Sequence, residues 1–192
     1  MSVEKLVVGL GNPGSRYARS RHNIGAKIVT AYAREEGLKP CRLSLIKAKL
    51  WQGKSRGREV VAAFPTTYMN ASGTAVKRCM TKHKVGPQDM LVVVDDVHIP
   101  FGRMRYREQG SSGGQKGMQS IIECLGTIEF PRLRIGVSEP AGEEMEQYVL
   151  SPFSVDEEAR LLPLVEAGVN MIKMWIENPD KMSHVTSNVA ID

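Results

Sequence analysis

One histidine of the sequence, His22, lies among residue types that take part in acid–base chemistry. It follows an apolar segment, LVVGL, and a glycine-rich bend, GNPG, and two asparagines, Asn12 and Asn23, are close to it in the chain. An imidazole has an ordinary pKa of about 6.5, so it can exchange a proton near neutral pH. Arginines at positions 16, 19 and 21 would attract negative charge. This mixture suits the hydrolysis of a phosphate-bearing molecule.

A pair of aspartates could supply the carboxylate that assists such a base. Asp95 and Asp96 end the apolar segment MLVVVDD, which predicts a buried strand. A carboxylate bonded to one imidazole nitrogen fixes the tautomer, so the other nitrogen can take a proton from water. Aspartates are also common in turns, and Pro100 follows, so a role in a turn is the alternative.

Asn70 precedes a helix predicted over residues 71–84, a position where asparagine usually acts as N-cap. Its alternative role is to aim a carboxamide N–H at the oxygen on which negative charge develops during ester hydrolysis. The sequence has no HExxH or CxxC pattern, so no metal centre is indicated. We therefore expect water to be the nucleophile and no cofactor to be required.

Residues 9–14 match the dinucleotide fingerprint GxGxxG between a predicted strand and a predicted helix. Pro13 lacks the N–H that a pyrophosphate would need. Glu35 and Glu36 lie where the fingerprint would have its ribose-binding acid, but they are in the last turn of the helix predicted over 24–36 and not at the end of a second strand. Both features argue against a nicotinamide cofactor. We expect the glycines instead to let the backbone and Asn12 approach a ligand closely.

Length and composition indicate one domain spanning residues 1–192. The chain is 42% apolar, which suffices for a full core, and it has no run of about 18 to 20 apolar residues that would span a membrane. The beginning, MSVEKLVVGL, contains an acid and no signal-peptide core. Three cysteines without CxxC spacing favour a reducing compartment. We expect a cytoplasmic protein with no membrane partner.

The net charge of +5 is gathered into a few basic runs, at 16–21, 77–84 and 103–107, whereas acids concentrate at 139–146 and 156–158. In GRMRYR the alternation would place three arginines on one face of a strand. Each run alone could be an ordinary solvated surface. Together, beside candidate site segments, they favour a nucleic-acid partner.

The order of predicted elements indicates an α/β fold with a mixed sheet. Strands are predicted over 5–10, 45–53, 59–65, 90–96, 103–107 and 132–138. The second and third are joined by a basic turn around Arg56 and Gly57, which predicts an antiparallel hairpin. Helices are predicted over 24–36, 71–84 and 117–125. A fourth helix is predicted to begin at a capping box formed by Ser154 and Glu157 and to continue through apolar residues that repeat at helical spacing from Leu161 to Ile176. Residues 178–192 are polar and predict a loose C-terminal tail.

Five segments, GLGNPGSRYARSRHNIG, FPTTYMNASGTAV, VVVDDVHIPFG, the GSSGG loop and FPRLRIGVSEP, together resemble bacterial-type peptidyl-tRNA hydrolases. They follow the family's order and extend from about Leu6 to Phe153. The resemblance implies a single α/β domain of the phosphorylase/hydrolase-like type, with a twisted mixed sheet between helices, usually as a monomer. It also implies the reaction, which is hydrolysis of the ester that joins a peptide to the 3′-terminal ribose of tRNA.

The resemblance also implies roles for individual residues. His22 would be the general base and Asp95, the first of the acidic pair, its orienting partner, while Asn12 and Asn70 would hold the substrate and stabilise the oxyanion. Further residues match positions that contact substrate: Tyr17 and Met69 near the terminal adenosine and peptide, and Arg105, Arg107 and Arg134 at the tRNA backbone.

The chain departs from the family pattern in its glycine loop. The family usually has Gly-Gly-His-Asn-Gly, and this chain has Gln115 and Lys116 at the third and fourth positions. Lys116 would face the substrate with donors but no acceptor, so we expect a slower hydrolase. His98 also stands where the family prefers an acid. The alternative function is an RNA-binding or splicing-type factor of the same fold with weak catalysis.

Overall fold

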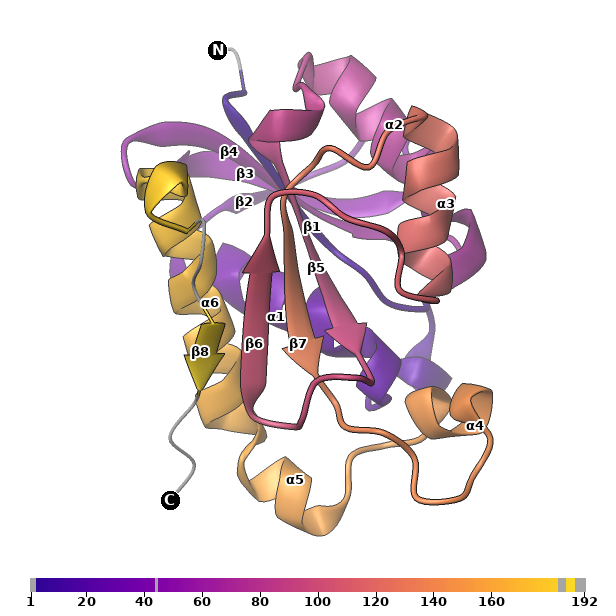
Figure 1. Cartoon of the computed structure of the whole chain (residues 1–192). Helices are drawn as coiled ribbons and strands as arrows, with labels where there is room; N and C mark the ends of the chain where they lie inside the picture. The colour runs from indigo at the N-terminus through magenta and orange to yellow at the C-terminus, as the bar shows by residue number, and fades with distance from the viewer. Residues whose placement is uncertain (1–2, 44, 183–185, 189–192) are drawn as a thin grey trace.

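A mixed sheet of eight strands runs through the centre of the protein, and helices cover both of its faces (Figure 1). The computed structural model describes residues 3–43, 45–182 and 186–188. In sheet order the strands are β2 (Lys39–Cys41), β3 (Ala48–Ser55), β4 (Arg58–Pro65), β1 (Lys5–Gly9), β5 (Met90–Asp96), β7 (Arg132–Gly136), β6 (Arg103–Arg107) and β8 (Thr186–Asn188). The pairs β4–β1, β1–β5 and β5–β7 are parallel, and the other pairs are antiparallel.

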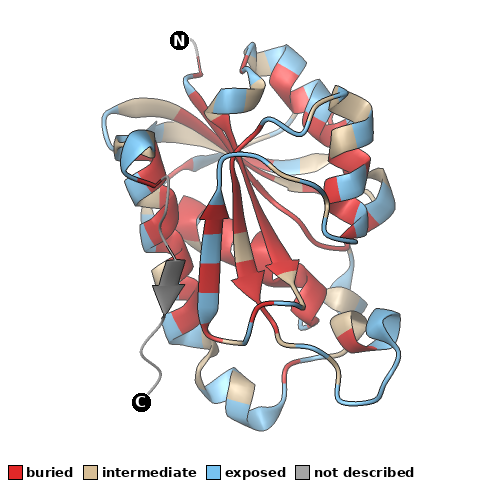
Figure 2. Cartoon of the chain, in the orientation of Figure 1, coloured by how far each residue is buried: buried red, intermediate tan, exposed pale blue. Residues whose placement is uncertain are grey.

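Two long helices pack on each face of the sheet. Helices α1 (Ile24–Glu35) and α6 (Leu161–Glu177) cover one face, and α2 (Ser72–His83) and α3 (Lys116–Leu125) cover the other (Figure 1). Along β1, Val7 packs in the core on the side of α1 and α6, whereas Leu6 and Val8 pack in the core on the side of α2 and α3. The central strands are therefore buried on both sides (Figure 2), which explains their uninterrupted apolar sequences.

Shorter elements complete the fold. Two helices, α4 (Met145–Leu150) and α5 (Val155–Ala159), lie past the tips of β5 and β7 in the view of Figure 1. The 3-10 helices are η1 (Ser15–Tyr17), η2 (Arg21–Asn23), η3 (Met69–Ala71), η4 (Pro87–Asp89) and η5 (Pro179–Met182). No helix in the described ranges is both long enough and apolar enough to cross a membrane.

The predicted α/β architecture and the β3–β4 hairpin are confirmed. The hairpin turn places Arg56 and Gly57 at φ values of 51° and 80°, the left-handed pair typical of tight hairpin turns. The alternation predicted in GRMRYR is also present, because the arginines of β6 are exposed while Met104 and Tyr106 are buried.

Two glycines let α1 approach the sheet at backbone contact distance. A Cβ on Gly9 would lie 2.4 Å from the carbonyl oxygen of Gly25, and a Cβ on Gly25 would lie 2.2 Å from that of Val93 in β5. No side chain fits at either position. This close crossing fixes the start of α1, and with it the residues of η2, against the ends of β1 and β5.

The helix predicted from Ser154 is wrong in its extent. The capping box of Ser154 and Glu157 is present, but it begins only the short α5, and α6 begins separately after Arg160. Pro163 has no N–H with which to continue the helix from α5. It is tolerated where it lies, in the first turn of α6, because the N–H groups of that turn have no partner within the helix.

The C-terminal segment is more ordered than a loose tail. Residues 179–182 form η5, which buries Met182, and Thr186–Asn188 pairs with β6 as the edge strand β8. Three residues are too few to form a pattern, so this pairing could not be predicted from the sequence. The rest of the predicted tail, residues 183–185 and 189–192, lies outside the described residues.

Candidate active site

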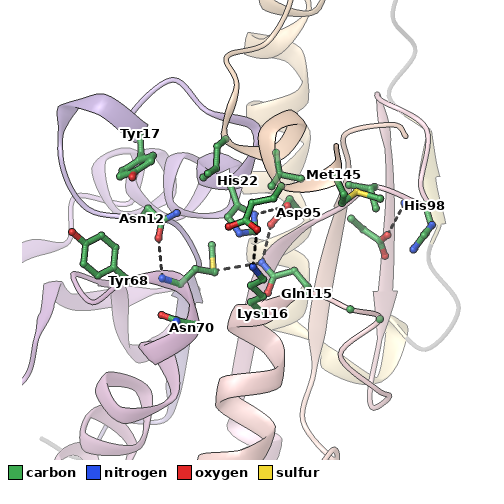
Figure 3. Close-up of a pocket in the computed structure, with 18 of the residues that line it drawn as sticks. Asn12, Tyr17, His22, Tyr68, Asn70, Asp95, His98, Gln115, Lys116 and Met145 are labelled. Atoms are coloured by element: carbon green, nitrogen blue, oxygen red, sulfur yellow. Dashed lines mark hydrogen bonds and ion pairs between the residues drawn. The ribbon is translucent and has the colours of Figure 1, made fainter. Parts of the chain in front are cut away.

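A cavity of about 680 Å³ opens where several chain segments meet at the ends of β1, β4 and β5 (Figure 3). The loop after β1, the segment after β4, the end of β5, the start of α3 and helix α4 all contribute side chains. The lining residues are Asn12, Tyr17, His22, Tyr68, Met69, Asn70, Asp95, Asp96, Val97, His98, Gly113, Gly114, Gln115, Lys116, Arg134, Glu144, Met145, Glu146, Val149 and Leu150. The cavity therefore collects residues that are up to 138 positions apart in the sequence (12 to 150).

His22 and Asp95 form a buried pair in this cavity. The Nδ1 atom of His22 lies 2.8 Å from Oδ2 of Asp95, and both side chains are more than nine-tenths buried. η2 presents the histidine and the C-terminal end of β5 presents the aspartate. Because Nδ1 is engaged by the carboxylate, Nε2 is the ring nitrogen left to accept a proton in the cavity.

The environment of His22 shifts its pKa. Burial of the ring is the largest single influence and lowers the pKa, but the charge of Asp95 and its hydrogen bond to the ring both raise it and together prevail. Lys116 lowers the pKa and Glu146 raises it by smaller amounts. The pKa of His22 therefore lies above its ordinary value of 6.5.

Gln115 makes the second contact with Asp95. Its Nε2 atom donates to Oδ1 of Asp95 at 2.9 Å and lies 3.5 Å from the sulfur of Met69. Its Oε1 atom accepts from the backbone N–H of Met118 at 2.8 Å, so the same side chain is the N-cap of α3. Both oxygens of Asp95 are thus engaged, one by His22 and one by Gln115.

Asn12 is held on two sides, by the backbone of Met69 and by the side chain of Asn23. Its Oδ1 accepts from the N–H of Met69 at 2.8 Å, and its own backbone N–H and carbonyl bond the side chain of Asn23 at 2.8 and 2.9 Å. With the oxygen of the carboxamide occupied, its N–H donors are the end available to a ligand. These contacts also join the loop after β1 to the segment after β4.

Asn70 lies in the cavity and does not cap a helix. The N-cap position of α2 is Ala71, and no side-chain cap bond is formed there. Asn70 is exposed, as is Tyr68, while Met69 between them is buried. The N-cap interpretation is therefore wrong, and the side chain is free to face a ligand at the rim.

The acidic pair is divided between the two faces of β5. Asp95 faces His22, whereas Oδ2 of Asp96 accepts from Arg134 at 3.0 Å and its Oδ1 accepts from the backbone N–H of His98 at 2.9 Å. Arg134 also donates to the carbonyl oxygen of Ser111 at 2.8 Å. The turn role considered for the aspartates is thus filled by Asp96 alone.

The remaining predicted residues lie at the rim or outside it. Tyr17 lines the cavity from η1, and Lys116 lies 3.2 Å from a carboxylate oxygen of Glu146 in α4. Arg105 and Arg107 are not among the lining residues; they lie on the exposed face of β6, where Arg105 is the register partner of Arg134.

The glycine fingerprint has a structural explanation that differs from our expectation. Gly9 and Gly11 face α1, since a Cβ on Gly11 would come within 3.0 Å of Ala26 and Asn23. They allow helix packing rather than close approach to a ligand. Glu36, one of the two acids considered for a dinucleotide site, accepts from Ser55 and Arg56 on the β3–β4 hairpin and does not bond the glycine loop after β1. In the described part of the chain no three metal-ligating side chains are grouped to hold an ion.

Comparison with known proteins places the chain in a family. The family model described as peptidyl-tRNA hydrolase matches residues 6–191. The chain is 43% identical over 175 residues to a peptidyl-tRNA hydrolase of Aquifex aeolicus, covering 90% of each chain. It is 48% identical over 166 residues to that of Chloroflexus aggregans, covering 85% of this chain and 87% of the relative. The chain belongs to the peptidyl-tRNA hydrolase family.

Solved structures agree with this assignment. The crystal structure of peptidyl-tRNA hydrolase from Acinetobacter baumannii superposes with a TM-score of 0.87 at 29% identity, over 96% of this chain and 94% of that one. The protein is therefore a carboxylic ester hydrolase that releases tRNA from peptidyl-tRNA. The predicted family, fold class and activity are confirmed.

Part of the hydrolase's cavity was not anticipated from the sequence. Helix α4 contributes Met145, Glu146, Val149 and Leu150, none of which the motifs indicated. A helix of six residues without a side-chain cap bond is too short for a clear apolar period. Gln115 was recognised as a departure from the family pattern, but nothing in the sequence showed that its side chain reaches Asp95.

Proposed function

We propose that His22 is the general base of peptidyl-tRNA hydrolysis and that Asp95 orients it. The observation that carries this proposal is the buried 2.8 Å contact between Nδ1 of His22 and Oδ2 of Asp95 inside the cavity. The carboxylate holds the proton on Nδ1 and stabilises the imidazolium that forms when Nε2 takes a proton. This arrangement supports water as the nucleophile.

The reaction proceeds in two proton transfers. A water molecule gives a proton to Nε2 of His22 while its oxygen bonds to the ester carbonyl carbon, which makes a tetrahedral oxyanion. The oxyanion collapses and the bond to the 3′ ribose oxygen breaks. The imidazolium then returns its proton to that oxygen. The products are tRNA with a free 3′-terminal hydroxyl and the peptide with a free carboxylic acid, which then loses its remaining proton to solvent.

Asn12 and Asn70 supply the amides that hold the substrate and stabilise the oxyanion. The carboxamide oxygen of Asn12 is already bonded to the backbone of Met69, so its N–H donors face the ligand without a cost of reorganisation. Asn70 is exposed at the rim and completes its contacts when the substrate binds. Tyr17 and Met69 also line the cavity, and the terminal adenosine and the peptide would lie against them.

The tRNA backbone binds along β6 and β7. Arg105 and Arg134 are register partners there, and Arg107 lies on the same exposed face. Side chains of this kind bind phosphates without reading sequence. Lys116, at the start of α3, contacts the substrate in competition with its ion pair to Glu146. We further propose that the protein acts as a monomer, as is usual in the family, and that it acts in the cytoplasm, a reducing compartment that suits its three free cysteines.

Substitution of His22 by alanine tests these roles. Peptidyl-tRNA hydrolysis should fall by about 10²- to 10⁴-fold, the usual contribution of a general base. Binding of tRNA, measured by filter retention or fluorescence, should remain within about twofold because the arginines are untouched. If the variant hydrolysed peptidyl-tRNA at the wild-type rate, His22 would not be the base.

A further inference from the structure

Gln115 joins three parts of the active site through one side chain. Its amide nitrogen donates to Oδ1 of Asp95 at 2.9 Å and touches the sulfur of Met69 at 3.5 Å, while its oxygen accepts from Met118 N–H at 2.8 Å (Figure 3). The residue is nine-tenths buried. A buried carboxamide with both ends bonded has a single allowed orientation.

These contacts fix the orientation of the Asp95 carboxylate. Because Gln115 holds Oδ1, the plane of the carboxylate is set and Oδ2 points at Nδ1 of His22. The amide also shares the negative charge of the carboxylate, because its N–H donates to one of the carboxylate oxygens. Two donors, one from Gln115 and one from the imidazole, therefore compete for the same charge.

We propose that Gln115 is a positioning residue for catalysis, which fixes Asp95 against His22 and limits how strongly that carboxylate holds the proton on the ring. Both ends of the Gln115 carboxamide are bonded within the protein, so its proposed action is through Asp95. The inference rests on the proposed roles of His22 and Asp95. It adds a neutral third member to the pair, and this member cannot gain or lose a proton near neutral pH.

Other charged groups face His22 and must be held constant in a test. Asp95 approaches from β5, Lys116 from the start of α3 and Glu146 from α4. A substitution of Gln115 by a neutral residue leaves all three in place. Any movement of the pH profile in such a variant therefore arises from the lost hydrogen bond rather than from a change of charge.

Two variants separate the contact with Asp95 from the helix cap. Gln115→Met has a similar length but neither donates nor accepts through an amide, so it loses both contacts. Gln115→Asn is a strong N-cap and keeps the acceptor for α3, but it is one methylene too short to reach Asp95. Gln119→Met, the same change one turn further along α3 at an exposed position, is the matched control.

The measurement is the pH dependence of kcat and KM for peptidyl-tRNA hydrolysis. We expect kcat to fall about tenfold in both Gln115 variants, a fraction of the contribution of a general base, with KM within about twofold of wild type. The midpoint of the rising limb should move to higher pH in both, because the unshared carboxylate holds the imidazolium more strongly. Gln119→Met should match wild type in every respect.

An unmoved midpoint in both Gln115 variants would overturn the proposal, because loss of a helix cap lowers stability without changing the ionisation of His22. The same conclusion would follow if Gln115→Asn behaved as wild type and only Gln115→Met was impaired. A fully active His22→Ala enzyme would instead refute the roles of His22 and Asp95 themselves. The two failures are therefore distinguishable.

Discussion

Replacement of Asp95 by asparagine is the sharpest perturbation that the site offers, because it keeps the shape of the side chain and removes only its charge. The oxygen at Oδ1 can still accept from Gln115, as it does at 2.9 Å. The new NH₂ group then occupies the position of Oδ2, 2.8 Å from Nδ1 of His22. Facing a donor, Nδ1 must be the unprotonated nitrogen, so the proton moves to Nε2.

The size of the effect follows from this change of tautomer. A protonated Nε2 cannot accept a proton from water, so the contribution of the general base should be lost, about 10²- to 10⁴-fold in kcat/KM. At 1.36 kcal/mol for each factor of ten, this is about 2.7–5.4 kcal/mol of transition-state stabilisation. The pKa of His22 should also fall below 6.5, because burial would then act without the opposing carboxylate.

The assay is the release of free tRNA from peptidyl-tRNA, followed as initial rates from about pH 5 to pH 9. The residual activity of Asp95→Asn should have its rising limb at lower pH than wild type. Asp95→Asn combined with His22→Ala should be no slower than His22→Ala alone, since the two residues act as a unit. A single Asp95→Asn variant within about threefold of wild type, or fully additive losses in the double variant, would refute the reasoning.

Five further outcomes follow from the structure. In wild type, the rising limb of kcat/KM against pH should have its midpoint above 6.5, because neutral His22 is the active form and its pKa is raised; a midpoint below 6.5 would contradict this. For the same reason the pair should stabilise the fold most below pH 6.5 and progressively less as the pH rises through the raised pKa, as urea denaturation at several pH values would reveal. Gly25→Ala, whose Cβ would lie 2.2 Å from a carbonyl oxygen of β5, should lower Tm by several degrees, and an unchanged Tm would show that α1 can shift. Joint replacement of Arg105 and Arg107 by alanine should raise KM, leave kcat unchanged and reduce the slope of log KM against log salt by about 1 to 2, whereas an unchanged slope would exclude phosphate contacts there. Lys116→Asn, which replaces a donor by a group that also accepts, should increase turnover; equal rates would mean that the departure in the glycine loop is harmless.

The sequence predicted the fold best where both faces of a strand are buried. β1 and β5 appear as uninterrupted apolar runs, and the hairpin was evident from the turn at Arg56 and Gly57. β2, β8 and α4 have three to six residues each, too few for any period, and depend on contacts with distant segments. The break between α5 and α6 was not predicted, because the effect of Pro163 outweighs the helical spacing of the apolar residues that follow Ser154.

The site was predictable by residue type more than by arrangement. The chemistry of His22 indicated a base, but its partner lies 73 residues away, and local sequence could not choose between Asp95 and Asp96. That choice came from the family resemblance. It has a physical reason in the structure, because neighbouring residues of a strand face opposite sides and only the first aspartate faces η2. The contact of Gln115 had no signal in the sequence.

The close crossing of α1 over the sheet has a consequence for how this enzyme tolerates change. The gap between helix and strands is set by main-chain atoms at Gly9 and Gly25, not by interlocking hydrocarbon groups. A substitution such as Ile28→Val elsewhere in α1 would change the volume of the core without moving the imidazole of His22. One added methyl at either glycine would instead lift the entire helix, and the reacting nitrogen would travel with it.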